Sequence, residues 1–197
     1  MKQLFSVLLV TISALVQAQI FDADIKNSTV GWVGKKITSQ HNGTVQLKAG
    51  FLGFKNGKLE AGKFEIDLNT ITCKDISDPQ KNADFVEHLK NDDFFSVNKF
   101  PLAVLTITRV VPKAGAAKGQ PNYTFFGNLS IKGKNNPVEF PATVEVNGKT
   151  LTGKAKFSIN RTKWDITYKS GTFFPSLADK AISDDIDFEV NIKAATK

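Results

Sequence analysis

The chain has 197 residues, a formal net charge of +7 and a single cysteine. This length suits one domain whose core is large enough to fold without disulfides, and one cysteine excludes an intrachain disulfide framework. The basic residues are spread along the whole chain with no base-stacking motif beside them, so the charge indicates solubility or a preference for anionic ligands, not nucleic acid.

The first 18 residues have the pattern of a secretory signal peptide. Lys2 supplies a positive start, residues 4–16 form an apolar run, and the sequence Val-Gln-Ala at 16–18 suits signal peptidase. The run is shorter than the ~20 residues that a membrane-spanning helix needs. We therefore expect cleavage after Ala18, a single mature domain over residues 19–197, no stable membrane insertion, and a periplasmic or secreted location.

Apolar and polar residues alternate from residue 29 onward, which is typical of strands with one buried face. Eight strands are predicted, at 29–37, 43–54, 58–70, 101–111, 122–132, 138–146, 149–159 and 185–194. Tight turns are expected at Asn56-Gly57, at Asn147-Gly148 and over residues 134–137, which makes neighbouring strands antiparallel. One short helix is expected over 82–90, and a surface loop over 112–121.

Eight hairpin-linked strands with one apolar face either close into a barrel or stack as a sandwich. Small residues beside bulky aromatics favour the barrel; they are Gly127, Ala142, Gly153 and Ala155. In a barrel, such residues either leave room for a ligand or match the taper of the wall, and the sequence leaves both readings open. The predicted fold is an all-β, eight-stranded antiparallel barrel with one short helix between the third and fourth strands.

Four segments share their order and spacing with a known family. They are His41 followed ten residues later by Phe51; residues 88–95 with Lys99-Phe100-Pro101; residues 127–133 with Asn136-Pro137-Val138; and residues 179–184. Together they resemble the YceI-like family of exported proteins over about 29–194. The resemblance implies a lipocalin-like barrel that binds a polyisoprenoid or related lipid. Phe85 and Val86 stand where many members carry Arg-Asp, which makes this helix more apolar and suits a lid.

The inward-facing apolar residues are expected to bind the lipid. The predicted lumen residues are Trp32, Phe64, Ile66, Leu68, Phe125, Leu129, Phe140, Val144, Phe157 and Phe188, and those of the lid or mouth are Phe85, Leu89, Phe94, Phe95, Arg161 and Lys163. Arg161, and after it Lys163, would meet an anionic head group, because a guanidinium suits phosphate. The alternative for Arg161 is a structural Arg–Asp pair that closes a turn.

No nucleophile motif or phosphate-binding loop occurs in the sequence, and Asp84, Glu87 and His88 lack a known zinc spacing. We therefore expect a lipid-binding protein with no catalytic residue, metal or cofactor. Two alternatives stay open: an isomerase- or hydrolase-type enzyme that uses His41 or His88 with a carboxylate, and an adhesion domain with a filled barrel. Cys73 is expected to be a small polar-surface residue, although a free thiol or a pairing between two chains is also open.

Overall fold

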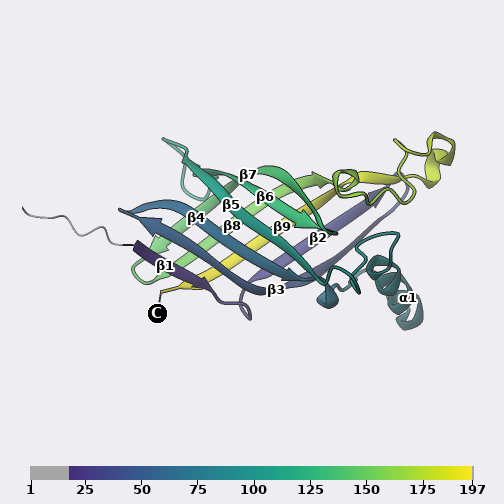
Figure 1. The fold of residues 1–197 in the computed structure, drawn as a ribbon, viewed down its shortest axis with the longest axis horizontal. Coiled ribbons are helices and arrows are strands. Elements are labelled where there is room, and N and C mark those ends of the chain that lie inside the picture. The colour runs from purple at the N-terminus through teal and green to yellow at the C-terminus, as the bar shows by residue number, and fades with distance from the viewer. Residues whose placement is uncertain (1–17, 197) are drawn as a thin grey trace, which may run out of the picture.

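The computed structural model describes residues 18–196, so the predicted signal peptide lies outside the described residues except for Ala18. Nine strands form one sheet (Figure 1): β1 (Ala18–Ala23), β2 (Thr29–Lys36), β3 (Gln40–Lys55), β4 (Lys58–Asp67), β5 (Leu102–Pro112), β6 (Tyr123–Ile131), β7 (Lys134–Asn147), β8 (Thr150–Asn160) and β9 (Ile182–Ala195). One α-helix, α1 (Pro79–Lys90), stands between β4 and β5, and short 3₁₀ helices cover Leu68–Thr70, Arg161–Trp164 and Pro175–Lys180.

The sheet closes into an antiparallel barrel because β3 pairs with β2 on one side and with β4 on the other. The wall has eight positions although nine strands build it. β2 pairs with the first part of β3, up to Val45, whereas β1 pairs with the last part, from Phe51. Both also pair with β9, so β1 continues the wall position that β2 occupies. The predicted eight-stranded barrel is confirmed, and β1 is a strand that the alternation pattern did not reveal.

Two of the three predicted turns differ in register from the structure. The Asn56-Gly57 turn is confirmed, with both residues at positive φ as a type I′ hairpin requires. The turn expected over 134–137 is wrong: Lys132 and Gly133 make it at positive φ, and Pro137 pairs with Asn128 inside β7. The last hairpin is shifted by one residue, because Asn147 pairs with Thr150 and leaves Gly148 at positive φ as the first turn residue.

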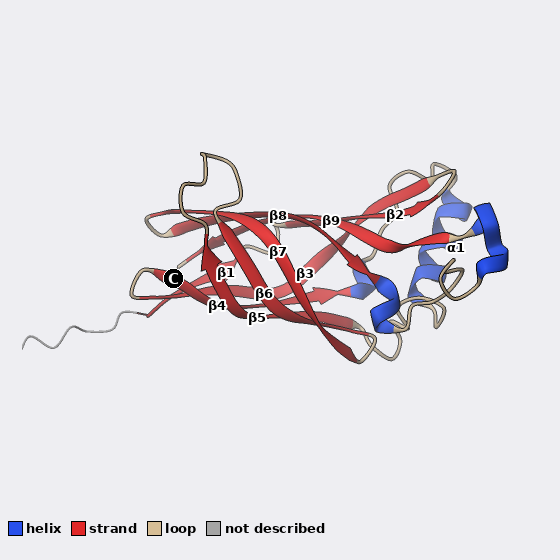
Figure 2. Ribbon diagram, turned by 90° about the horizontal axis from the view of Figure 1, so that it is seen from above, coloured by secondary structure: helices blue, strands red, loops and turns tan. Residues whose placement is uncertain are grey.

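The helix begins three residues earlier than expected. Asp78 caps it by accepting a hydrogen bond from the Lys81 backbone N–H, and Pro79 occupies the first turn, where its missing N–H leaves no hydrogen bond unmade. α1 lies at one end of the barrel, and β1 and the C-terminal end of β9 lie at the other (Figures 1 and 2). No helix among the described residues is long and apolar enough to cross a membrane.

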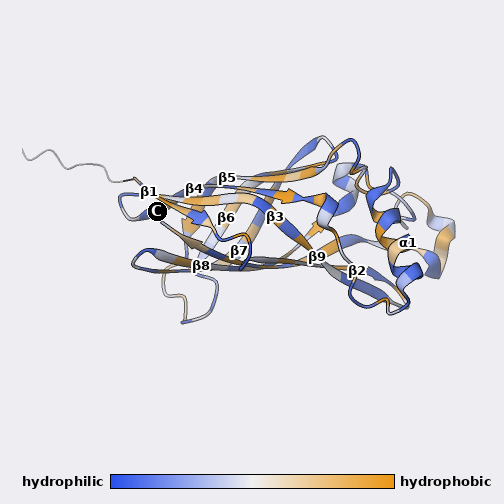
Figure 3. Ribbon diagram, turned by 90° about the horizontal axis from the view of Figure 1, so that it is seen from below, coloured by the Kyte–Doolittle hydropathy of each residue, from blue (hydrophilic) through white to orange (hydrophobic). Residues whose placement is uncertain are grey.

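Apolar and polar residues follow one another along the strands (Figure 3), and the buried apolar side chains form one core inside the barrel, as the alternation predicts. Part of this core lies at the end away from α1. There Phe21 of β1 is 0% exposed, and its ring meets the ring of Phe54 edge-on with 5.4 Å between centroids. Leu151 of β8 is 1% exposed and pairs with Ala194, which in turn pairs with Ala23 of β1. This plug closes one end of the barrel, and the single interior rules out the two-sheet sandwich.

Candidate functional site

An apolar cavity of about 400 Å³ runs from the middle of the barrel to α1. Its volume lies within the ~300–1,000 Å³ typical of ligand pockets. All ten residues predicted for the lumen line it: Trp32, Phe64, Ile66, Leu68, Phe125, Leu129, Phe140, Val144, Phe157 and Phe188. Their position inside the barrel is therefore as expected, while their contact with a lipid stays a prediction. Strands β2 to β9 contribute to the lining and β1 does not, since β1 belongs to the closed end.

A row of aromatic rings forms one wall of the cavity. Phe125, Phe140, Phe157 and Phe188 stand on neighbouring strands from β6 to β9, and successive ring centroids lie 5.6, 4.5 and 5.6 Å apart in stacked arrangements. Trp32 continues the row, because it pairs with Phe188 across β2 and β9. The buried Trp32 Nε1 has no hydrogen-bond partner among the described residues.

The small residues predicted to face inward divide into two groups. Gly153, Ala142 and Ala155 line the cavity, and a Cβ on Gly153 would meet Ile192 at an ordinary contact distance of 3.7 Å. Gly127 instead permits a close backbone approach, since a Cβ there would lie 2.6 Å from the Thr106 carbonyl oxygen. Three of the four therefore leave room inside the barrel, and the fourth is a packing requirement.

The predicted lid residues gather at the α1 end. Phe85 and Leu89 of α1 line the cavity together with Phe94 and Phe95 from the turn that follows the helix. His88 also lines it, with its ring edge-on to Phe94 and to Tyr168 at centroid distances of 5.1 and 4.9 Å. The cavity thus ends beneath an aromatic cover and not in a wall of strands.

Arg161 does not occupy the expected mouth position as a free cation. Its side chain borders the cavity but is 1% exposed, and it donates to the backbone carbonyls of Ser183, Ile166 and Ile182 at 2.9, 2.6 and 3.1 Å. Asp184 accepts a fourth, longer bond at 3.5 Å. Burial lowers the pKa of Arg161, and the Asp184 carboxylate acts against that shift. These bonds fit the alternative role expected for Arg161, a structural Arg–Asp pair. They correct its assignment as a free cation for an anionic head group.

Lys163 is exposed and does not line the cavity, so it is misplaced for the same role. Other lysines stand at the mouth. Lys35 pairs with Asp187 at 2.5 Å, whereas Lys36 and Lys169 have no carboxylate partner among the described residues. Both flank the cavity residue Ile182: Lys36 pairs with it across β2 and β9, and the Ile182 N–H donates to the Lys169 carbonyl. Sequence reasoning missed them because nothing local distinguishes these lysines from other surface lysines.

Each histidine lines the cavity and stands beside a carboxylate. His41 Nδ1 lies 2.7 Å from Asp75 Oδ2, and His88 Nε2 lies 3.0 Å from Asp93 Oδ2. Both pairs therefore meet the geometric requirement of the enzyme alternative, a histidine at the cavity next to an acid. Such a pair can move a proton. The partner of His41 is Asp75. The partner of His88 is Asp93 and not Glu87, its neighbour on α1, because adjacent residues on a helix point in different directions.

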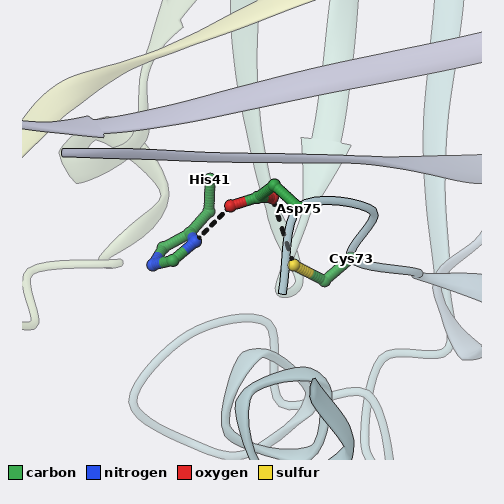
Figure 4. Close-up of side chains that lie close together, drawn as sticks. All are labelled: His41, Cys73 and Asp75. Carbon is green, nitrogen blue, oxygen red and sulfur yellow. Dashed lines mark hydrogen bonds and ion pairs between the residues drawn. The ribbon is translucent and has the colours of Figure 1, made fainter. Parts of the chain in front are cut away.

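Cys73 joins the first of these pairs (Figure 4). Its thiol donates to Asp75 Oδ1 at 3.3 Å, so His41 and Cys73 meet opposite oxygens of one carboxylate. Cys73 is 7% exposed, which corrects the expected surface position, and its burial raises the pKa of the thiol. Burial alone would raise the pKa of Asp75, but hydrogen bonds from the Asn42 N–H, His41 and Cys73 outweigh it and lower that pKa.

Comparisons with known proteins agree with this geometry. A family model described as the YceI-like domain matches residues 21–194. A UPF0312 protein of Pseudomonas putida (strain W619) is 27% identical over 169 residues, covering 82% of this chain and 83% of the relative. One from Shewanella denitrificans is 33% identical over 93 residues, covering 47% of this chain and 44% of the relative, so that alignment spans less than half of each protein.

Two solved structures share the fold. BcnA of Burkholderia cenocepacia has a TM-score of 0.65 at 23% identity, over 88% of this chain and 99% of its own. A polyisoprenoid binding domain from Saccharophagus degradans, described as implicated in plant cell wall breakdown, has a TM-score of 0.62 at 13% identity, over 90% of this chain and 98% of its own.

Proposed function

Because the chain belongs to the YceI-like family, we propose that it is an exported binding protein that holds one apolar lipid, of the polyisoprenoid or fatty-acyl type, in the barrel lumen. The observation that carries this proposal is the apolar cavity of about 400 Å³, closed at one end by the Phe21 plug and covered at the other by α1. Transfer of a tail from water into such a space stabilises the complex by about 0.8 kcal/mol per CH₂. Affinity then needs no catalytic group.

A lipid with a polar end has one favourable orientation in this cavity. The interior offers aromatic and aliphatic surface, whereas the mouth carries Lys36 and Lys169 without acidic partners among the described residues. An anionic head group buried without a countercharge would cost several kcal/mol. The proposal therefore places a phosphate or carboxylate between these two lysines, with the tail toward Phe140 and Phe157.

Two measurements test the binding function. Mass spectrometry of an organic extract of the purified protein should recover a lipid in near-equimolar amount. Titration of the delipidated protein with a polyprenyl alcohol and with a fatty acid should then give saturable binding to the wild type. Gly153→Phe, which would direct a ring into the free space, should weaken binding at least tenfold, whereas Gly153→Ala should bind as the wild type does. Equal affinity of all three proteins would contradict a ligand in the lumen.

The head group is tested separately. Replacing Lys36 and Lys169 together by Ala should weaken the binding of a polyprenyl phosphate by roughly 1.5–3 kcal/mol, the free energy of a charge-assisted hydrogen bond. Binding of the neutral alcohol should stay nearly unchanged. Lys163→Ala is the matched control, since this lysine is exposed and does not line the cavity. If the double variant binds both ligands as the wild type does, the head group lies elsewhere.

The His41–Asp75 and His88–Asp93 pairs support a second candidate, proton-transfer chemistry on the bound lipid. Incubation of the protein with the recovered lipid distinguishes the two functions. A pure binding protein returns the lipid with unchanged mass and unchanged double-bond positions. An altered product that disappears in His41→Gln or His88→Gln would favour an isomerase or hydrolase.

A further inference from the structure

We propose that His41, Cys73 and Asp75 form a binding site for a divalent transition-metal ion of the zinc type, at the edge of the cavity mouth. The three ligand atoms all lie within 4.8 Å of one another, and the residues come from two segments that the fold brings together (Figure 4). His41 stands near the start of β3, and Cys73 and Asp75 stand in the loop before α1. The site borders the proposed lipid cavity through His41, and its argument does not rest on the proposed lipid binding.

The distances are close to those that a tetrahedral metal site requires. Zinc bonds of ~2.0–2.3 Å to nitrogen, oxygen and sulfur place neighbouring ligand atoms about 3.3–3.7 Å apart. The Cys73 Sγ–Asp75 Oδ1 separation is already 3.3 Å, and the His41 Nδ1–Asp75 Oδ2 separation is 2.7 Å, about 0.6 Å short of the ideal range. These two distances end on different oxygens of Asp75, and one oxygen lies within 4.8 Å of both other ligand atoms. The remaining pair starts within 4.8 Å and needs to close by about 1 Å at most. Cys73 and Asp75 lie in a loop, where such shifts require no strand to move.

The chemistry of the three groups selects the kind of ion. A thiolate with an imidazole favours zinc, and disfavours magnesium or calcium, which prefer oxygen ligands alone. Thiolate and carboxylate together carry two negative charges, which a divalent cation neutralises; this matters because Cys73 is 7% exposed. Three protein ligands also leave the fourth tetrahedral position to water or to a polar group of a bound molecule.

The surroundings already hold the ligands in place, as outer contacts do in metal sites. The Asn42 backbone N–H donates to Asp75 Oδ1 at 2.7 Å, and the Phe85 ring packs against the His41 ring with centroids 4.6 Å apart. The Asn82 side chain donates to the Cys73 carbonyl at 3.0 Å, which ties the loop to α1. The other histidine pair, His88 with Asp93, lacks a thiol and serves as the natural comparison.

Cobalt substitution tests the proposal directly. The full mature protein is kept reduced with a non-chelating phosphine, stripped with a chelator and titrated with Co²⁺, followed by optical absorption. We expect one Co²⁺ per chain with a thiolate-to-cobalt charge-transfer band in the near ultraviolet, and loss of the band when Zn²⁺ is added. Cys73→Ser should abolish the band and weaken Zn²⁺ binding at least 100-fold. Loss of an outer partner alone weakens metal binding by roughly 10–100-fold, and loss of a direct ligand should cost at least the upper end of that range.

Two further variants keep the result interpretable. His88→Gln should retain the band and the affinity of the wild type, since it removes the histidine that has no cysteine nearby. Asp75→Asn should lose affinity as Cys73→Ser does, with circular dichroism confirming that both variants are folded. The proposal is overturned if the wild type gives no charge-transfer band, if the band survives in Cys73→Ser, or if His88→Gln weakens metal binding as much as Cys73→Ser does.

Discussion

Replacing Arg161 with Ala should destabilise the fold and should not selectively weaken a phosphorylated ligand. The guanidinium bonds three backbone carbonyls and Asp184 from a position that is 1% exposed. Removal leaves those acceptors without their donor and the carboxylate without its countercharge. Breaking a buried pair by removing one partner costs about 3–5 kcal/mol, and a buried acceptor left unsatisfied costs about 1–3 kcal/mol. Because water can enter the space, we expect a total loss near 3–5 kcal/mol, a large share of the ~5–15 kcal/mol by which domains are stable.

Equilibrium unfolding in guanidinium chloride, followed by circular dichroism, measures this loss. Lys163→Ala is the control two residues along the same 3₁₀ helix; its side chain is exposed, so its effect should stay within about 0.5 kcal/mol. Arg161→Lys should fall between the two, because an ammonium retains the charge without the planar fork of donors. A loss below about 1 kcal/mol in Arg161→Ala, combined with weaker binding of a polyprenyl phosphate but not of its alcohol, would refute the structural role.

Three other perturbations probe the plug, the loop and the pH dependence. Phe21→Ala should lower the free energy of unfolding by about 3–5 kcal/mol in denaturant titrations, whereas Ile20→Ala, at a 47% exposed neighbour, should lower it by less than about 1 kcal/mol; similar losses would mean that the plug is unimportant. Gly43→Ala should lower the melting temperature, because a Cβ there would lie 1.8 Å from the Thr72 carbonyl oxygen; an unchanged melting temperature would contradict that close approach. The pKa of Asp75 is lowered in the fold, so its stabilisation is complete above the unfolded pKa and is lost as pH falls through the folded one. Between pH 6 and pH 3 the wild type should therefore lose more stability than Asp75→Asn in urea titrations, and equal losses would show that this carboxylate carries no such linkage.

The strands and the lumen could be predicted because the inward-facing residues of a strand recur at every second position of its sequence. All ten predicted lumen residues line the cavity for this reason. β1 was missed because its first residue, Ala18, is the last residue of the expected signal peptide, and the five residues that follow offer little alternation. The turn at 132–133 was misplaced because several Asn, Gly and Pro residues competed for it. The register that aligns Phe125 with Phe140 decides among them, and that register depends on the whole sheet.

The polar groups of the site could not be predicted in the same way. Apart from the nearby Ile166 carbonyl, the partners of Arg161 stand in β9, 21 to 23 residues away, and Asp75 is 34 residues from His41 in sequence. Local composition carries no information about such distances, since barrel closure and the path of the loop set them. The alternative of a structural Arg–Asp pair could not identify Asp184, because Asp184 is 23 residues from Arg161 in sequence.

The two ends of the barrel differ in a way that gives a bound molecule a direction. At one end Phe21 and Leu151 are buried in the core, and β1 completes the wall around them. At the other end the cover is α1, of which only Leu89 is buried among its twelve residues. Elements with little buried apolar surface open at a lower free-energy cost than core strands do. Passage past α1 therefore costs less than passage through the plug. For the proposed lipid we therefore predict entry past α1, with the tail against the aromatic row and the polar end beside Lys36 and Lys169, because that end of the cavity offers charge and access to water while the interior offers neither.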